Sequence, residues 1–240
     1  PRDLHLSIRR QRQMCIRDSP KGWGIRDPLR SLSNKQDYHF TKEGTTMVEM
    51  TEKEKAAQGL LYNAYYDNEL ISERAYCKAI CYEYNQLHPA KIEERTALIQ
   101  KLFGKTGGSF LIEPPFICDY GYNIEIGSNF YANHNCIILD GAKVVFGDNV
   151  MIAPNCSFYT AGHPLDVERR NAGLEYAYPV KVGSNVWIGG NVAVLPGVTI
   201  GDNAVIGAGS IVTKDIPSDV VAFGNPCRVI RKISDKDKKF

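Results

Sequence analysis

A six-residue period in the second half of the chain constrains its fold more than any other feature. The aliphatic residues that carry this period are Val182, Ile188, Val194, Ile200, Ile206 and Val212. Glycine follows four of these six residues, which permits a tight corner beside each of them. A unit of this length holds one short strand and one turn, and three units return the chain to its starting side. The period therefore predicts parallel coils stacked at the strand spacing, with the aliphatic side chains inside.

An earlier stretch keeps the same period in two phases. One set of positions is Ile126, Ala132, Ile138 and Val144, and the other is Phe146, Ile152 and Phe158. Because the members of each set are six apart but the two sets do not share a phase, we expect a small insertion near residues 142–145.

The repeat is interrupted between Phe158 and Val182. Four units separate these residues, and the three positions between them hold a proline, an arginine and a tyrosine where aliphatic residues are expected. We therefore expect residues 161–179 to leave the coils as an excursion loop. Long loops on a regular scaffold often carry function, and this one contains His163.

The residues before the repeat show helical patterns instead. Thr51 and Glu54 match a capping box, which predicts a helix from there to about Tyr66. Ser72 is the expected cap of a second helix, whose apolar residues Cys77, Ile80, Cys81 and Tyr84 fall on one face. A third helix should end near Gly104. The sequence thus predicts a small helical cap in front of the coils.

These patterns divide the chain into four parts. Residues 1–46 are rich in arginine and have no sustained period, so we interpret them as a disordered or non-native leader rather than a functional basic arm. The helical cap is expected at 47–108, the β-helix domain at 109–233 and a short tail at 234–240. The predicted fold class is therefore mainly β, a parallel β-helix with an N-terminal α-helical cap.

Charge and composition exclude several classes of protein. Residues 1–46 hold ten basic and five acidic residues, whereas the other 194 residues hold 19 and 22, so the main body gives no reason to expect nucleic-acid binding. No run of about 18 apolar residues exists, so no membrane span is expected. The chain has seven cysteines without a CxxC motif, which favours free thiols in a reducing cytoplasm over a disulfide or zinc framework.

Four segments carry a resemblance to the maltose and galactoside O-acetyltransferases. They are DYGYNIEIGSNFYANHNCIILD (119–140), IAPNCSFYTAGHPLD (152–166), KVGSNVWIGGNVAVLPGVTIGDNAVIGAGSIVTKDIP (181–217) and GNPCRVIRKI (224–233). The resemblance extends over roughly residues 50–233. It implies a left-handed parallel β-helix, a homotrimer with active sites between neighbouring subunits, acetyl-CoA as co-substrate and no metal. The helical cap then lies on the acceptor side of the acyltransferase domain.

The same resemblance makes His163 the expected catalytic base. Transfer of acetyl from a thioester to an alcohol needs a group that removes the hydroxyl proton as the new bond forms. Histidine titrates nearest to neutral pH and suits this task. We expect direct attack of the hydroxyl on the acetyl carbon, without an acetyl-enzyme. Cys136 and Cys156 are conceivable nucleophiles, but their places in the repeat favour packing.

Four residues match acceptor-site positions of that family: Asp67, Asp119, Asn133 and Asp140. Side chains of these types recognise sugars because they exchange several hydrogen bonds with hydroxyl groups. Asp140 is expected as a sugar ligand or as a residue that orients the histidine, although some relatives have the aspartate one position later, at Gly141 here. Asp67 is equally compatible with an aspartate at the end of a helix. His134 is compatible either with a residue that selects the substrate or with a residue that only lines the wall of the pocket.

Seven residues match positions that line the family's cofactor groove: Trp187, Gly190, Ala208, Thr213, Lys214, Arg228 and Arg231. The small residues leave room for the pantetheine arm, and the three cations suit the CoA phosphates.

Three alternatives remain open from the sequence. The first is acetyl transfer to another acceptor, such as a lipo-oligosaccharide, an antibiotic or an amine. The second is a non-enzymatic scaffold, which would not need a histidine on an excursion loop. The third is a zinc enzyme resembling the γ-class carbonic anhydrases, which needs three converging histidines. After Met47 the chain has only His88, His134 and His163, and the first of these lies in the helical cap.

Overall fold

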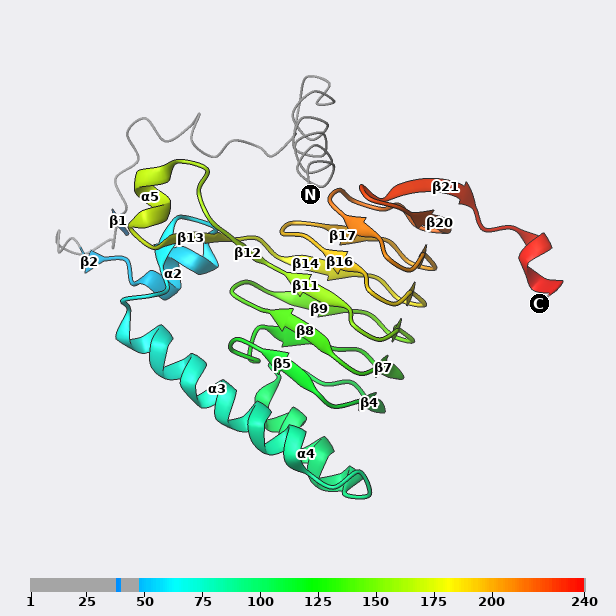
Figure 1. Cartoon of the computed structure of the whole chain (residues 1–240), viewed down its shortest axis with the longest axis horizontal. Coiled ribbons are helices and arrows are strands. Elements are labelled where there is room, and N and C mark those ends of the chain that lie inside the picture. The colour runs from blue at the N-terminus through cyan, green and yellow to red at the C-terminus, as the bar shows by residue number, and fades with distance from the viewer. Residues whose placement is uncertain (1–37, 40–47, 240) are drawn as a thin grey trace, which may run out of the picture. The chain divides into compact units, whose positions relative to one another are not determined.

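The computed structural model describes residues 38–39 and 48–239 (Figure 1). The expected leader, residues 1–46, lies almost wholly outside the described residues. The chain forms two units, residues 1–50 and 51–240. The described part of the first unit is an antiparallel pair of short strands, β1 (Tyr38–His39) and β2 (Val48–Glu49). None of the described helices is long and apolar enough to cross a membrane.

The first helix of the cap begins where the sequence predicts and ends earlier. In α2 (Glu52–Ala57), the Thr51 hydroxyl accepts from the Glu54 amide and the Glu54 carboxylate accepts from the Thr51 amide, so the capping box is confirmed. The predicted end near Tyr66 is wrong. Gly59 has a φ of 69°, a left-handed conformation that terminates the helix. The chain then enters β3 (Tyr62–Asn63), which pairs with a strand of the excursion loop.

The second helix begins four residues before the predicted cap. Asp67, not Ser72, caps α3 (Asn68–Gln86), because its carboxylate accepts from the Leu70 amide at 2.8 Å. The Ser72 hydroxyl instead donates to the Asn68 carbonyl within the helix. The predicted apolar face of this helix is buried, as expected. The third helix, α4 (Ile92–Leu102), lies where it was predicted.

The coils place their strands in three parallel sheets. The first sheet contains β4 (Phe110–Ile112), β7 (Phe130–Ala132), β10 (Met151–Ile152), β15 (Trp187–Ile188), β18 (Val205–Ile206) and β20 (Val220–Phe223), and β21 (Arg228–Lys232) adds to it antiparallel. The second contains β5 (Phe116–Cys118), β8 (Cys136–Leu139), β11 (Ser157–Tyr159), β16 (Ala193–Val194) and β19 (Ile211–Val212). The third contains β6 (Ile124–Glu125), β9 (Val144–Phe146), β14 (Val180–Val182) and β17 (Thr199–Ile200).

The strand register explains the change of phase in the repeat. Tyr131 pairs with Met151, twenty residues on, whereas Trp187 pairs with Val205, eighteen residues on. The additional residues of the longer coil lie in the corner between β8 and β9, at 140–143. This corner overlaps the predicted insertion at 142–145. The parallel β-helix predicted from the period is therefore confirmed.

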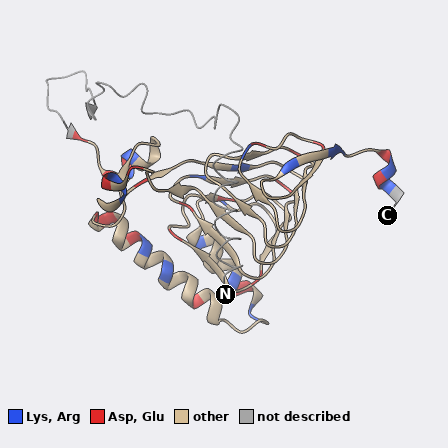
Figure 2. Ribbon diagram, turned by 45° about the horizontal axis from the view of Figure 1, so that its top comes forward, with Lys and Arg blue, Asp and Glu red and all other residues tan. Residues whose placement is uncertain are grey.

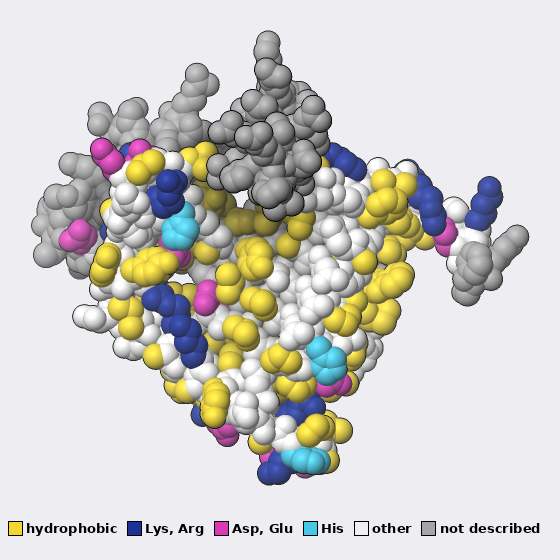
Figure 3. Space-filling view, in the orientation of Figure 1, with side chains coloured by type: hydrophobic (Ala, Val, Ile, Leu, Met, Phe, Trp, Pro, Cys, Tyr) yellow, Lys and Arg dark blue, Asp and Glu magenta, His cyan; other side chains and the backbone are white. Residues whose placement is uncertain are grey.

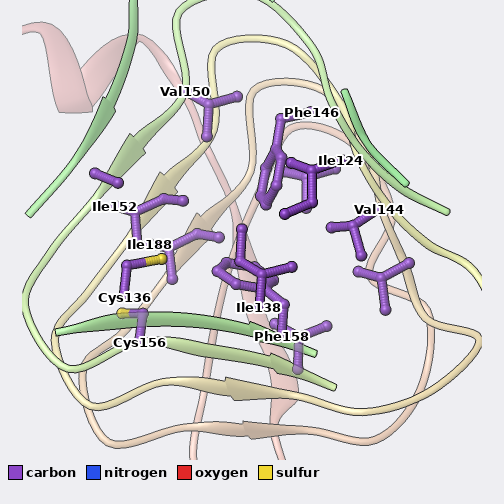
Figure 4. Packing of buried hydrophobic residues seen from close by; sticks show 14 of the residues in the cluster. Ile124, Cys136, Ile138, Val144, Phe146, Val150, Ile152, Cys156, Phe158 and Ile188 are labelled. Carbon is purple, nitrogen blue, oxygen red and sulfur yellow. The ribbon is translucent and has the colours of Figure 1, made fainter. Parts of the chain in front are cut away.

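The aliphatic positions of the repeat form one continuous core, as expected. Ile188, Val194 and Ile200 are each 0% exposed, and their equivalents in neighbouring coils lie directly above and below them. Aromatic rings fill the wider coils, where Phe146 and Phe158 meet edge to face with centroids 5.0 Å apart (Figure 4). Burial of this column from coil to coil supplies most of the stability of such a solenoid.

Asparagines at the corners add a second ladder on the outside. Asn149, Asn185 and Asn203 adopt a positive φ near 58°, which asparagine tolerates better than most residues. Each of the first two donates from its side-chain amide to the side-chain oxygen of the next at 3.0 Å. The corners therefore stay in register along the stack.

Residues 161–179 leave the coils as a folded excursion. The loop contains β12 (Ala161–Gly162), the short helix α5 (Val167–Asn171) and β13 (Leu174–Ala177). β13 lies between β12 and β3 in an antiparallel three-stranded sheet. The loop is thereby fixed against the start of the helical cap, at the same end of the molecule in Figure 1.

Candidate active site

The register of the excursion loop brings His163 opposite Glu175. Gly162 pairs with Tyr176 in the β12–β13 hairpin, so the next residues on the two strands are His163 and Glu175. The His163 Nε2 atom lies 3.9 Å from a carboxylate oxygen of Glu175. In Figure 3 a histidine lies beside acidic and apolar side chains, at the edge of a hollow near the end of the molecule that holds α5 and β13. The loop thus presents a histidine and a carboxylate together at the surface.

The contacts of the His163 ring assign different roles to its two nitrogens. Nδ1 lies 3.1 Å from the Leu174 carbonyl oxygen, which can only accept, so Nδ1 carries the proton and donates. In the neutral ring Nε2 is then the basic nitrogen. The side chain is 42% exposed, and the Tyr65 ring stacks on it at a centroid distance of 6.5 Å. The imidazole is oriented by its neighbours, and its basic nitrogen can still be reached from solvent.

Glu175 is a candidate functional residue that the sequence pattern did not indicate. Its side chain is only 16% exposed, and burial raises the pKa of its carboxyl, while the nearby His163 opposes this shift. The Tyr62 hydroxyl donates to its second carboxylate oxygen at 3.2 Å. Tyr62 comes from β3, so the cap and the loop together hold the carboxylate beside the histidine.

Asp119 belongs to the same group of side chains. Burial raises the pKa of its carboxyl, and the cations Arg74 and Lys78 lower it. The charge of Asp119 in turn raises the pKa of Glu175, so the two carboxylates share one environment. Arg74 donates to the Tyr120 hydroxyl at 2.6 Å and to the Ala64 carbonyl. Asp119 is therefore a half-buried carboxylate close enough to Glu175 for its charge to act on that residue.

Asp140 does not lie where a sugar contact or a contact with the histidine was expected. It is 0% exposed, and its carboxylate oxygens accept from the backbone amides of Asp119, Tyr120 and Gly121 at 3.0, 2.9 and 2.7 Å. No hydrogen bond joins Asp140 to His163 among the described residues. Burial raises the pKa of Asp140 to about 6, although the three amides oppose this shift. The residue fixes the corner that carries Asp119.

Asp67 and Asn133 are engaged within their own segments. The Asp67 carboxylate caps α3, which agrees with the interpretation of this residue as a helix-terminal aspartate. The Asn133 side-chain oxygen accepts from the His134 amide at 2.8 Å, and His134 Nδ1 contacts the Pro114 carbonyl. Asn133 and His134 lie in the corner after β7. Within the described part of a single chain, neither Asp67 nor Asn133 forms a hydrogen bond with His163 or Glu175.

The positions expected to contact CoA follow the outer face of the first sheet. Trp187 pairs with Val205, Val205 with Val221 and Val221 with Arg231, so tryptophan and arginine occupy the same register position three strands apart. Both are more than half exposed. Figure 2 shows basic residues along β21, the outermost strand of this sheet.

The small residues of this set lie at one corner of successive coils. Gly190 follows β15 and Ala208 follows β18, and the Gly209 amide donates to the Gly190 carbonyl at 2.8 Å. Thr213 and Lys214 follow β19, where the Lys214 side chain is exposed. The structure thus places two of these residues together in a narrow corner with little side-chain bulk.

The two arginines have local partners at present. Arg228 donates to the Cys227 carbonyl at 2.8 Å, and Arg231 forms a two-bond ion pair with Asp237 at 2.7 and 2.8 Å. A phosphate that binds Arg231 has to compete with Asp237 for the guanidinium group. This competition is possible because an exposed ion pair contributes little net stabilisation.

Cys136 and Cys156 pack in the core, as the repeat predicted. Each is 0% exposed, and the Cys156 thiol donates to the Gly189 carbonyl at 3.1 Å. Burial raises the pKa of both thiols, which keeps them protonated and unreactive.

Comparison with known proteins supports this division into a cap and coils. Residues 55–107 match the family model of the maltose acetyltransferase hexapeptide capping motif, and residues 179–214 match that of the bacterial transferase hexapeptide with six repeats. The chain is 53% identical over 171 residues to the galactoside O-acetyltransferase of Escherichia coli, which is 71% of this chain and 84% of that one.

Two solved structures share the whole arrangement. A maltose O-acetyltransferase from Clostridium difficile 630 has a TM-score of 0.76 and 54% identity, covering 78% of this chain and 99% of that one. A galactoside acetyltransferase in complex with coenzyme A has a TM-score of 0.77 and 49% identity, covering 80% and 96%. The likeness spans the cap, the excursion loop and the coils.

Proposed function

Because the chain belongs to the family of hexapeptide-repeat acetyltransferases that includes the maltose and galactoside O-acetyltransferases, we propose that it transfers acetyl from acetyl-CoA to a hydroxyl group of a sugar, with His163 as the general base. The observation that carries the proposal is the orientation of the His163 ring. Nδ1 donates to the Leu174 carbonyl, which leaves Nε2 as the basic nitrogen of a side chain that is 42% exposed.

The proton transfer follows from this orientation. Nε2 accepts the proton of the sugar hydroxyl as its oxygen attacks the acetyl carbon, and the thioester bond breaks with release of CoA. The imidazolium that forms has the Glu175 carboxylate 3.9 Å from Nε2, which stabilises the developing positive charge. A positioned base of this kind contributes about 10²- to 10⁴-fold to the rate. Glu175 acts here as a positioning residue through His163.

Asp119 supports the acceptor side of the proposal. The Asp119 carboxylate is half-buried beside the Glu175 group, where it can accept hydrogen bonds from sugar hydroxyls. Asp140 contributes indirectly, since it fixes the backbone of residues 119–121. Asp67 stays a possible acceptor-site residue, since its helix cap uses only one of its two carboxylate oxygens.

On the donor side, we assign acetyl-CoA to the outer face that carries Trp187 and Arg231. Lys214, Arg228 and Arg231 offer cations to the phosphates, while Gly190 and Ala208 leave space for the pantetheine arm. Two relatives were solved with coenzyme A or acetyl-CoA, which supports this co-substrate.

We further propose a homotrimer in which neighbouring subunits share each active site. The Asn133 side chain has no hydrogen bond to His163 within the described part of one chain, which agrees with a site that receives Asn133 and His163 from different copies. The described cysteines are free thiols, in keeping with a reducing cytoplasm.

The acceptor is tested by thiol release from acetyl-CoA against a panel of sugars and other acceptors. The panel contains maltose, glucose, galactosides, chloramphenicol and a primary amine. CoA release that depends on a sugar supports the proposal. Release with the amine or the antibiotic alone would move the chain to another acceptor class on the same scaffold.

Sharing of the site is tested by mixing two inactive variants. His163→Ala and Asn133→Ala are unfolded together, refolded together and assayed. Mixed trimers regain activity if each site takes these residues from different subunits, since some sites then have both wild-type residues. Activity that stays at the level of the separate variants would place both residues in one subunit.

A further inference from the structure

Three cysteines from distant parts of the sequence meet between the helical cap and the coils. Cys77 and Cys81 lie one turn apart on α3, and Cys118 ends β5. Their exposed fractions are 0%, 5% and 1%. The Cys118 sulfur lies 3.4 Å from that of Cys77 and 3.8 Å from that of Cys81, and all three sulfurs lie within 4.8 Å of one another. We call these residues the three-cysteine cluster.

The sulfur spacing matches that of ligands around one metal ion. Thiolates bind such ions at about 2.3 Å, which puts neighbouring sulfurs about 3.8–4.0 Å apart in tetrahedral or trigonal geometry. Two of the three sulfur–sulfur distances in the cluster, 3.4 and 3.8 Å, are close to this range, and the third is within 4.8 Å. An ion at the centre could therefore contact all three sulfurs at once.

The convergence of three thiols sets this cluster apart from Cys156 in the coils. The Cys156 thiol donates to a backbone carbonyl, and the Cys77 thiol also donates to one, that of Cys118 at 3.3 Å. In the three-cysteine cluster each thiol has another thiol as a neighbour. Thiols bind a metal ion as thiolates, so an ion has to displace their protons when it binds.

We propose that the three-cysteine cluster is a binding site for one thiophilic d¹⁰ metal ion, Cu(I) in the first place. Soft thiolate ligands select Cu(I) or Zn(II), but structural zinc takes four protein ligands. No fourth histidine, cysteine or carboxylate joins the cluster in the part of the chain that the structure describes. Cu(I) accepts three-sulfur coordination. Binding forms three Cu–S bonds, releases up to three thiol protons to solvent and leaves the oxidation state unchanged.

The metal would tie the helical cap to the coil that carries Asp119. It therefore acts on structure and lies apart from the proton transfer at His163. Because only the folded chain brings the three sulfurs together, binding must raise the midpoint of thermal unfolding. At a free ion concentration 100 times Kd we expect a rise of at least about 5 °C.

The test uses the full-length, reduced protein under anaerobic conditions. A coloured Cu(I) chelator competes with the protein over several hours, since the buried sulfurs are reached only slowly. We expect transfer of one equivalent of copper, and X-ray absorption with three sulfur neighbours at about 2.2–2.3 Å. Copper that stays on the chelator, or a site with fewer than three sulfurs, would overturn the proposal. Zinc that displaces the copper would overturn the assignment to Cu(I).

Matched variants locate the site. Cys77→Ala, Cys81→Ala and Cys118→Ala should each lower the affinity for copper at least 100-fold. Cys156→Ala, which changes an equally buried thiol outside the cluster, should leave it unchanged. Unaltered binding in any of the first three would refute the assignment of that residue. If a variant fails to fold, the sulfur count in the wild-type protein still decides.

Discussion

Replacing Asp140 by alanine tests whether this buried carboxylate fixes the corner of the acceptor site. The side chain is fully buried and accepts from three backbone amides, at 2.7–3.0 Å. An alanine side chain cannot accept, so the three buried amides lose their partner.

The expected cost follows from these contacts. A buried hydrogen bond to a charged group contributes about 1.5–3 kcal/mol, and an unpaired buried amide costs about 1–3 kcal/mol. The burial of the carboxylate itself is unfavourable and offsets part of this sum. We expect the Asp140→Ala variant to lose about 3 kcal/mol of unfolding free energy. For a chain of this size the midpoint of thermal unfolding then falls by about 6–12 °C.

The loss should also depend on pH. The folded-state pKa of Asp140 is raised to about 6, above the ordinary value of 3.8 for an aspartate, so the folded chain binds this proton more tightly than the unfolded chain. Wild-type stability therefore rises as pH falls from 6 towards 4, by about 1.4 kcal/mol per unit within this window. The variant lacks this contribution, so the difference between the two proteins should widen from pH 7 to pH 5.

The assay is thermal and urea unfolding at equal protein concentration, followed by circular dichroism. Asp148→Ala is the matched control, because Asp148 accepts from the Ser128 amide at 2.7 Å but is exposed. It should lose no more than about 1 kcal/mol. A loss below about 1 kcal/mol for Asp140→Ala, or equal losses in the two variants, would refute the argument from burial.

Three further predictions concern the site and the core. Glu175→Gln should lower kcat at least about tenfold with little change in the KM for acetyl-CoA. Because burial raises the pKa of Glu175, the wild-type rate should fall on the acidic side at a pH above the ordinary pKa range of a glutamate, and the variant should lack this fall. An unchanged kcat would exclude a role for this carboxylate. Arg231→Ala should raise the KM for acetyl-CoA about fivefold, with Lys232→Ala as the control, and equal effects of the two would point to general charge rather than a specific contact. Ile188→Ala should cost about 3 kcal/mol in urea unfolding, whereas Ile92→Ala, at a position 58% exposed, should cost less than about 0.5 kcal/mol, and similar costs would contradict the assigned core.

The coils could be predicted from the sequence because their physical signal is repeated. Each aliphatic residue of the repeat has the same environment as its copy in the next coil, so the period reports burial directly. The helical cap has no such redundancy. Its first helix was predicted too long because the pairing of β3 with the excursion loop, which lies over 100 residues away, decides where the chain turns.

The site could be predicted only where a single residue carries the signal. His163 stands out because it lies in the interruption of the repeat. Glu175 was missed because its relation to His163 depends on the register of the β12–β13 hairpin, which no local pattern reveals. Asp140 was misjudged for a related reason: its acceptor contacts are to backbone amides one coil away, and amides leave no trace in the sequence.

The same limit applies to the three-cysteine cluster. Cys77 and Cys81 have helical spacing, but Cys118 is brought to them only by the packing of α3 against β5. The absence of a CxxC motif therefore excludes only sites built from local spacing, and a site that the fold assembles escapes such a search.

The central claim is that His163 removes the proton in a sugar-dependent acetyl transfer. The most direct measurement is the rate of CoA release with saturating acetyl-CoA and sugar, for the wild-type protein and for His163→Ala. The account predicts a fall of at least about 100-fold in the variant, with binding of acetyl-CoA retained. A variant that keeps its rate within about threefold, or a wild-type protein that releases no CoA with any sugar, would contradict it.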